Sequence, residues 1–527
     1  MRRVERSREE KREGGAAAPP HVLGEGGLTL AGLAALVDSR DARIAASPDA
    51  LERVRRARRT VDDIVARGAV VYGITTGFGK LAGTRIGAQD IERLQRNLIL
   101  SHSTGVGPPL SERETRAMIV LRANALLRGF SGVTEGLVAS LLALFNARVT
   151  PLVPEQGSVG ASGDLAPLAH LALGLIGEGE SSYGGRLLAS SEALAAAGLR
   201  PAVLQAKEGL ALINGTQATA AIGGLALERA RSLAKTADVA AAMTLEGAKG
   251  SLTAFDPRIQ AVRPHPGHAE VAANVRALMA ESEILESHAN CGKVQDAYSL
   301  RCVPQVHGAI RDALRHAIEV TEREIDSVTD NPLVFADDGD VISGGNFHAE
   351  PIALVFDYAA IALTELGNIS ERRIESLVNP DISGLPAFLA PNPGLNSGLM
   401  ITQVVAAALA SENKVLAHPA SADTIPTSAN KEDHVSMGTH AARKLRQIVD
   451  NVERIVAIEM MCAAQAIDFH APLRPGRGVA AAWHAVRERV PKLGDDRVLA
   501  GDIESIRAAI RSGAILAAAE RASGPLS

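Results

Sequence analysis

The sequence predicts an all-α protein, and three observations lead to that prediction. Alanine and leucine are abundant while aromatic residues make up only 3% of the chain, a composition that favours helix over sheet. Early in the chain, apolar residues recur at helical spacing with arginine and aspartate between them: Leu51, Val54, Ala57, Val61, Ile64 and Val65. Later, three long and largely apolar stretches are typical of the core of a helical bundle: residues 350–375, 396–416 and 435–469.

Length and charge place the chain among globular proteins. It has 527 residues, of which 46% are hydrophobic and 22% charged, so a sizeable core can form. The net charge of −5 gives no basic footprint, so no nucleic-acid partner is expected. No run approaches 18 uninterrupted apolar residues, so we expect no membrane-spanning helix. The three cysteines, Cys291, Cys302 and Cys462, are too few and scattered for a disulfide framework and fit a reducing cytoplasm.

The remaining segments continue the helical pattern. Residues 1–22 begin with a stretch dense in arginine, glutamate and lysine that has no apolar core, so we expect a disordered extension and not a secretory signal. Helical periodicity covers residues 28–68, and a glycine-broken loop follows at 70–82. Further expected features are a helix at 118–144 interrupted near Gly129 to Gly132, an alanine-rich helix ending near Gly247, a polar interhelical face at 370–373, and polar helical material at 472–527.

The stretch from Gly157 to Asp164 carries the most unusual chemistry. The amide nitrogen of Gly163 could attack the carbonyl carbon of Ala161 and close a five-membered ring, because glycine has no Cβ to block the approach. Loss of the Ser162 hydroxyl as water would then leave a carbon electrophile made from the backbone. These residues alone favour a simple turn instead, with Asp164 capping an apolar helix over residues 165–176.

Residues 157–170 resemble the signature of the aromatic amino acid ammonia-lyases; their sequence is Gly-Ser-Val-Gly-Ala-Ser-Gly-Asp-Leu-Ala-Pro-Leu-Ala-His. Members of that family build a 4-methylidene-imidazol-5-one (MIO) group autocatalytically from Ala-Ser-Gly, so the resemblance implies MIO at Ala161-Ser162-Gly163 and no external cofactor. It also implies the fumarase/aspartase-like architecture: a long central helical bundle at 211–527 with C-terminal helices, and a smaller MIO-bearing domain at 23–210. In the family, active sites are shared between chains of a homotetramer.

The resemblance assigns the other site residues as well. Tyr72 would be the base that removes the β-proton, Tyr298 and Asn214 would lie beside MIO, and Arg301 would hold the substrate carboxylate. Gln295 and Phe347 would line the pocket. Gln295, Tyr298 and Arg301 are spaced by three, so on a helical path they would share one side, which could equally be a solvated face.

Two motifs indicate the substrate. The pair Ser101-His102 and the residue Glu432 match the histidine-acting members of the family, and the resemblance implies that His102 and Glu432 bind an imidazole. The resemblance therefore implies non-oxidative deamination of L-histidine to trans-urocanate and ammonia, the first step of histidine degradation. Two departures are Lys431, where glutamine is usual, and Thr75, where asparagine is common. A metal site at Glu432-Asp433-His434 is not favoured, because the other histidines lack ligand spacing.

Three alternatives remain open. A tyrosine ammonia-lyase would have the same fold and the same MIO group. A tyrosine 2,3-aminomutase would return the amine to the β-carbon, although Lys80 is more typical of lyases. A non-catalytic helical scaffold would not need Ala161-Ser162-Gly163 together with Tyr72 and Arg301.

Overall fold

The computed structural model describes residues 19–77, 79–289 and 291–527; the side chain of Lys80 is also outside the described part. The predicted extension at 1–22 therefore lies mostly outside it. Its expected end is wrong by two residues, because His21–Leu23 form strand β1, which pairs in parallel with β2 (Ile44–Ala46). This small sheet also interrupts the helical region expected at 28–68, which divides into α1 (Leu30–Asp38) and α2 (Pro48–Ala66).

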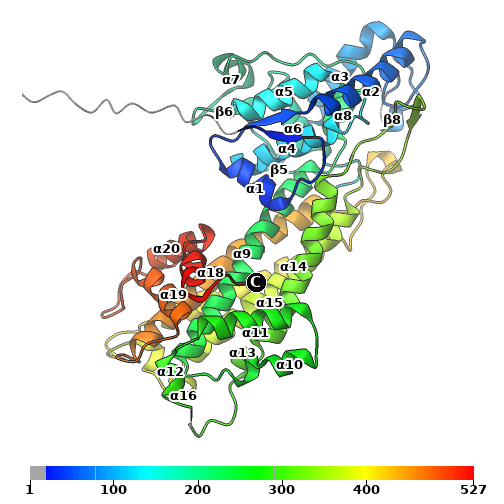
Figure 1. Ribbon diagram of the computed structural model, residues 1–527. Coiled ribbons are helices and arrows are strands. Elements are labelled where there is room, and N and C mark those ends of the chain that lie inside the picture. The colour runs from blue at the N-terminus through cyan, green and yellow to red at the C-terminus, as the bar shows by residue number, and fades with distance from the viewer. Residues whose placement is uncertain (1–18, 78, 290) are drawn as a thin grey trace, which may run out of the picture.

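A bundle of long helices forms the centre of the molecule and confirms the all-α prediction (Figure 1). The bundle consists of α9 (Gln217–Gly247), α14 (Val303–Ile325), α15 (Glu350–Val378), α17 (Met400–Leu416) and α18 (Gly438–Asp468). Helices α15, α17 and α18 match the three predicted apolar stretches, although α17 begins four residues later than the stretch. Their buried side chains are mostly alanine, leucine, isoleucine and valine, so the helices can pack closely.

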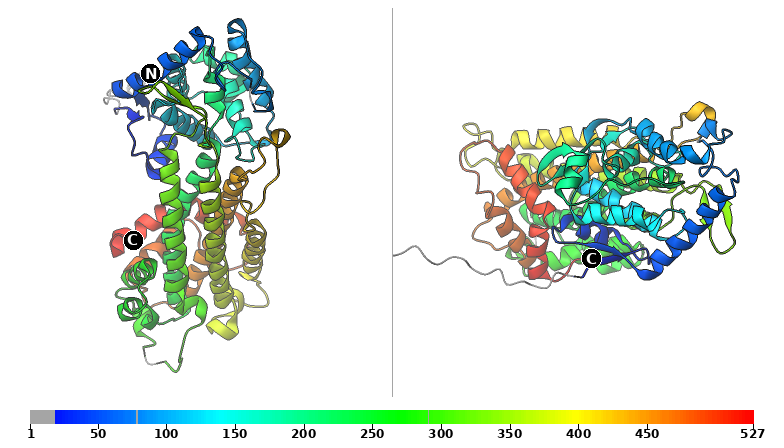
Figure 2. Two further views of the ribbon diagram at one scale, coloured as in Figure 1. Left: turned by 90° about the vertical axis from the view of Figure 1, so that its right-hand side faces the viewer. Right: turned by 90° about the horizontal axis from the view of Figure 1, so that it is seen from above.

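One end of the bundle carries the N-terminal part of the chain (Figures 1 and 2). Its further helices are α3 (Ile91–His102), α4 (Glu112–Leu127), α5 (Glu135–Asn146), α6 (Leu165–Leu175), α7 (Ser190–Ala196) and α8 (Glu208–Ile213). Short antiparallel strands, which the sequence did not indicate, brace this end: β3 (Val106–Pro109) with β5 (Pro154–Gln156), β4 (Thr150–Pro151) with β6 (Glu180–Tyr183) and β7 (Arg186–Ala189), and β8 (Leu333–Phe335) with β9 (Asp340–Ile342). The expected domain boundary at 210/211 falls inside α8, and the division itself stays a prediction.

Shorter helices surround the rest of the bundle. They are α10 (Pro257–Ala261), α11 (Pro266–Leu278), α12 (Glu283–Glu286), α13 (Tyr298–Arg301) and α16 (Pro380–Ser383), followed by the C-terminal α19 (Arg477–Arg487), α20 (Ala500–Arg511) and α21 (Ala514–Ser523). Helix α13 lies near the end of the bundle opposite α6 (Figure 1). This separation matters for the site described below.

A buried ion pair ties the central helices together. Arg373 and Glu459 are both fully buried, with Nε 2.6 Å from Oε1 and Nη2 2.8 Å from Oε2. Ser370 Oγ and Thr244 Oγ1 donate to the same carboxylate at 2.6 and 2.8 Å. The polar face predicted at 370–373 is thus an interhelical contact that joins α9, α15 and α18, and its charges are compensated within the core.

Two stretches are long and apolar enough to cross a membrane, Glu208–Gly247 and Glu350–Val378. Their most apolar windows are 100% and 72% buried inside the protein, as expected for core helices of a bundle.

Candidate active site

The tripeptide Ala161-Ser162-Gly163 lies in a tight turn directly before α6. Gly163 has a φ of +73°, and a Cβ built on it would lie 2.4 Å from both the amide nitrogen and the carbonyl oxygen of Gly215. No other residue type fits there without moving the backbone. Asn214 Nδ2 donates to the Ser162 carbonyl oxygen at 2.8 Å, and the Ser162 hydroxyl donates to the carboxylate of Glu432. The Asn214 Oδ1 atom is buried and has no hydrogen-bond partner among the described residues.

Asp164 does not cap the following helix, contrary to the simple turn-and-cap interpretation. It occupies the N-cap position of α6, but its side chain makes no capping hydrogen bond. The fully buried carboxylate instead accepts hydrogen bonds from Ser158 Oγ at 2.8 Å, from Thr439 Oγ1 at 2.7 Å, and from the amide and hydroxyl of Thr219 at 2.7 and 2.8 Å. Asp164 therefore attaches the tripeptide turn to the first turns of α9 and α18.

Glu432, which accepts the hydrogen bond of the Ser162 hydroxyl, also lies within electrostatic range of His102. His102 is the last residue of α3, and its Nδ1 is 3.0 Å from Ser101 Oγ. Burial lowers the pKa of His102, while a hydrogen bond with the Leu98 carbonyl and the negative charge of Glu432 oppose that shift. The charge of Glu432 thus reaches both His102 and Ser162, two of the positions that the sequence indicated.

The loops of Tyr72 and Phe347 reach the same end of the molecule. The half-buried Tyr72 accepts a hydrogen bond from the Gly79 amide at 3.4 Å, and a Cβ on Gly73 would lie 2.7 Å from Leu210 on α8. Because α8 ends directly before Asn214, the Tyr72 loop packs beside the tripeptide region. Two residues after Phe347, the amide of Ala349 donates to the Gly160 carbonyl at 3.2 Å.

Gln295, Tyr298 and Arg301 do not join this group within one chain. They lie in and before α13, near the opposite end of the bundle (Figure 1). The expected shared helical side is wrong for Gln295, which precedes the helix. Arg301 Cζ stacks 4.5 Å from the centre of the Tyr298 ring, and Tyr298 is 70% exposed. Arg301 and Gln295 line a cavity of about 510 Å³, and Arg301 Nε is buried without a hydrogen-bond partner in the described chain.

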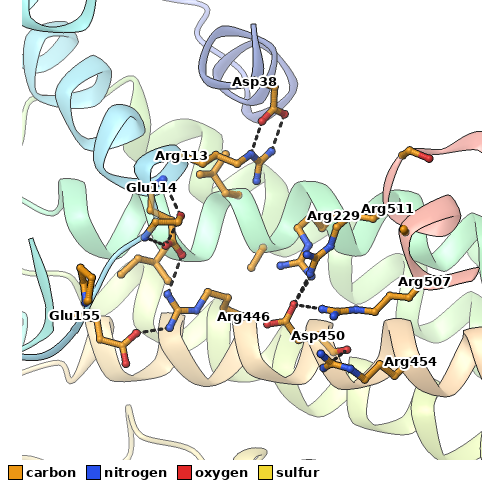
Figure 3. A pocket seen from close by; sticks show the side chains of 17 residues that line it. Asp38, Arg113, Glu114, Glu155, Arg229, Arg446, Asp450, Arg454, Arg507 and Arg511 are labelled. Atoms are coloured by element: carbon orange, nitrogen blue, oxygen red, sulfur yellow. Dashed lines mark hydrogen bonds and ion pairs between the residues drawn. The ribbon is translucent and has the colours of Figure 1, made fainter. Parts of the chain in front are cut away.

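The largest cavity described, about 1010 Å³, lies elsewhere and is lined by six arginines (Figure 3). Three of them, Arg229, Arg507 and Arg511, place an Nη2 atom 2.6, 2.9 and 2.6 Å from one oxygen of Asp450. Arg446 bridges Glu114 and Glu155 in the same cavity. No predicted site residue lines it, and its arginines are paired with acidic side chains, so it is a network of ion pairs between α9, α18 and α20.

Two features near Glu432 were missed from the sequence. Thr427 Oγ1 donates to Glu432 Oε2 at 2.5 Å, and only the five-residue separation could have suggested it. His348, Glu350 and His434 bring one possible metal-ligand atom each within 4.8 Å of one another. Two of these residues, His348 and His434, also stack their rings 5.8 Å apart between centroids.

Comparisons with known proteins identify the family. Residues 28–488 match the family model for aromatic amino acid lyases. A histidine ammonia-lyase from Sorangium cellulosum is 57% identical, with 95% of this chain and 99% of that protein aligned.

Two solved structures are also close in fold. The crystal structure of histidine ammonia-lyase from Trypanosoma cruzi superposes with a TM-score of 0.90 at 46% identity and covers 96% of each chain. A tyrosine aminomutase from Streptomyces globisporus gives 0.91 at 37% identity, covering 97% of this chain and all of its own. The family model spans most of the chain and the matches extend over nearly its full length, and the chain therefore belongs to the aromatic amino acid lyase family.

Proposed function

We propose that the protein is an ammonia-lyase that converts L-histidine to trans-urocanate and ammonia. One observation carries the choice of substrate: Glu432 accepts the hydrogen bond of Ser162 in the Ala161-Ser162-Gly163 turn, and its charge also acts on His102. A carboxylate and a neutral imidazole can each hydrogen-bond a ring nitrogen of histidine, whereas a phenyl or phenol ring offers no such ring atoms. The 57% identity to a histidine ammonia-lyase supports the same choice.

The residues of the turn fit an MIO group. Gly163 has the close approach and the positive φ that only glycine tolerates, and Asn214 already donates to the Ser162 carbonyl. Once formed, the group supplies an electrophile that converts the substrate amine into a better leaving group. Every other task falls to side chains of the protein, and no external cofactor is required.

Each side chain then has a defined role in the proposed reaction. Tyr72 removes the β-proton as a general base, and its loop packs beside the turn. Glu432 and His102 hold the imidazole, and Phe347 lines the pocket. Asn214, which donates to the Ser162 carbonyl, lies beside the prosthetic group.

The carboxylate side of the substrate needs a second chain. Arg301 can offer paired donors to a carboxylate, with Tyr298 and Gln295 beside it, but these residues lie at the other end of their own bundle. A homotetramer in which the α13 end of one chain meets the α6 end of another brings the two sets together.

Exposed apolar side chains on α15 and α17 support this assembly. They are between 41% and 72% exposed: Leu354, Tyr358, Ile361, Ile401, Val404, Val405 and Val415. So many exposed large apolar side chains on two packed helices are typical of an interaction site. The three free cysteines fit a cytoplasmic location. The net charge of −5 fits a small-molecule substrate and gives no reason to expect nucleic acid.

The runner-up is a tyrosine-acting enzyme, favoured only by the aminomutase neighbour at 37% identity. Ultraviolet absorbance of the purified protein with L-histidine, L-tyrosine or L-phenylalanine separates the two. We expect urocanate to accumulate with histidine alone, and Ser162→Ala to abolish it. Coumarate or cinnamate without urocanate would overturn the choice of substrate, and β-tyrosine, detected by chromatography because it has the same phenol absorbance as tyrosine, would point to the aminomutase.

A further inference from the structure

A closed six-residue turn presents Glu432 to the site. The backbones of Thr427 and Glu432 pair, with the Thr427 amide 2.8 Å from the Glu432 carbonyl and the Glu432 amide 3.4 Å from the Thr427 carbonyl. The Thr427 hydroxyl then crosses the neck of the turn and donates to Glu432 Oε2 at 2.5 Å. The carboxylate is therefore held from its own loop.

The chain between these two residues adopts a costly conformation. Ser428, Ala429 and Asn430 have φ values of 49°, 52° and 64°, in the left-handed region that side-chain-bearing residues avoid. The Lys431 amide donates to the Ser428 carbonyl at 3.2 Å, and the turn packs against residues 79–81 of the Tyr72 loop. Such strain persists where the surroundings dictate the geometry, and it occurs frequently at functional sites.

The two oxygens of Glu432 have different partners. Oε1 accepts the hydrogen bond of the Ser162 hydroxyl, and Oε2 accepts that of Thr427. Under the proposed function, Ser162 loses its hydroxyl as water when the prosthetic group forms. Of the side-chain donors to Glu432 in the described chain, Thr427 alone then remains, and Oε1 is available to the substrate.

We infer that Thr427 is a positioning residue for imidazole recognition, a role that rests on the proposed function. Its hydroxyl fixes Oε2 and the rotation of the carboxylate, so that Oε1 faces the imidazole ring. Without the hydroxyl, the carboxylate can turn about its terminal bond and the ring loses an aligned acceptor. Hydrogen bonds to charged groups are worth enough that kcat/KM should fall about tenfold to a hundredfold.

The test compares Thr427→Val, which keeps the shape but loses the donor, with Thr427→Ser, which keeps the donor. We expect Thr427→Val to raise KM for histidine more than it lowers kcat, because the ring contact already forms in the ground state. Thr427→Ser should recover most of the activity. Thr424→Val is the matched control, because the Thr424 hydroxyl accepts from the Val435 amide at 2.9 Å and makes no hydrogen bond to Glu432 within the described residues.

A double-mutant cycle separates positioning from a merely structural role. In a Glu432→Gln background the acceptor is uncharged, and Thr427→Val should cost only about threefold to tenfold, because charge-assisted hydrogen bonds are roughly twice as strong as neutral ones. If Thr427→Val stays within twofold of the wild type, or loses the same factor in both backgrounds, the inference is wrong. Thr427→Ala replaces Thr427→Val in the cycle if the valine variant fails to fold.

The mass of the tripeptide-bearing fragment distinguishes a failure of the proposed function from a failure of the role inferred for Thr427. In the wild type and in every Thr427 variant, it should be lower than the encoded mass by two water molecules. A wild-type fragment of full mass, or a wild type without activity on histidine, would overturn the proposed function itself. Matured Thr427→Val protein with unchanged KM would overturn only the role of Thr427.

Discussion

Mixing two inactive variants should restore activity, because the two halves of the site lie at opposite ends of one chain. Ser162→Ala removes the reacting group from one end, and Arg301→Ala removes the carboxylate ligand from the other. When both chains are co-expressed in equal amounts, a site works only if one chain supplies Ser162 and another supplies Arg301. Each condition is met with a probability of about one half, so about one quarter of wild-type activity should appear.

Urocanate formation by the co-purified mixture measures this recovery, with each variant alone as the background. The matched control mixes Ser162→Ala with Glu432→Ala, since these two side chains are in contact within one chain and no pairing can restore both. That mixture should stay inactive. Recovery in the control, or none with Arg301→Ala, would refute a site assembled from separate chains.

Three further predictions follow from single contacts. Gly163→Ala should leave the tripeptide fragment at its full encoded mass in mass spectrometry, because its Cβ would lie 2.4 Å from Gly215; a matured fragment would contradict the steric reasoning. Arg373→Met should lower the free energy of unfolding in urea by about 3–5 kcal/mol, because Glu459 is left charged and buried, and Arg373→Met with Glu459→Met should regain most of that loss. Burial lowers the pKa of His102, so its ring stays neutral to a more acidic pH than an ordinary histidine. The acid limb of kcat/KM assigned to this group should therefore lie below the usual histidine range, and His102→Gln should remove that limb; a limb unchanged in the variant would exclude His102 as its source.

The long helices could be predicted from the sequence because the apolar spacing that specifies a helix lies within the helix itself. Apolar spacing alone gives α15 and α18 to within a few residues, since each turn repeats the same pattern. The short strands could not be predicted, because pairs such as β1 with β2 or β4 with β6 bring together residues that are distant in the sequence. Two to four residues carry too little alternation to indicate a strand.

The site shows the same division. The tripeptide could be recognised as able to cyclise because cyclisation depends on three consecutive residues, but only the family resemblance favoured that interpretation over a plain turn. The destination of the Asp164 carboxylate could not be recognised, because its partners Thr219 and Thr439 come from two other helices. A capping preference is only a local tendency, and here tertiary hydrogen bonds outweigh it.

The length of the central bundle fixes the distance between its two ends. Helix α9 has 31 residues, which at 1.5 Å per residue is roughly 46 Å, and the pair of Arg373 and Glu459 prevents its neighbours α15 and α18 from sliding along one another. If two chains pair in antiparallel orientation, this length sets how far apart the two shared sites of the pair lie. Each chain then supplies its α13 residues to one site and its tripeptide turn to the other. Lengthening one bundle by a single helical turn would therefore misalign both sites at once. The length of the bundle is thus a requirement of the proposed shared site, in addition to its reacting side chains.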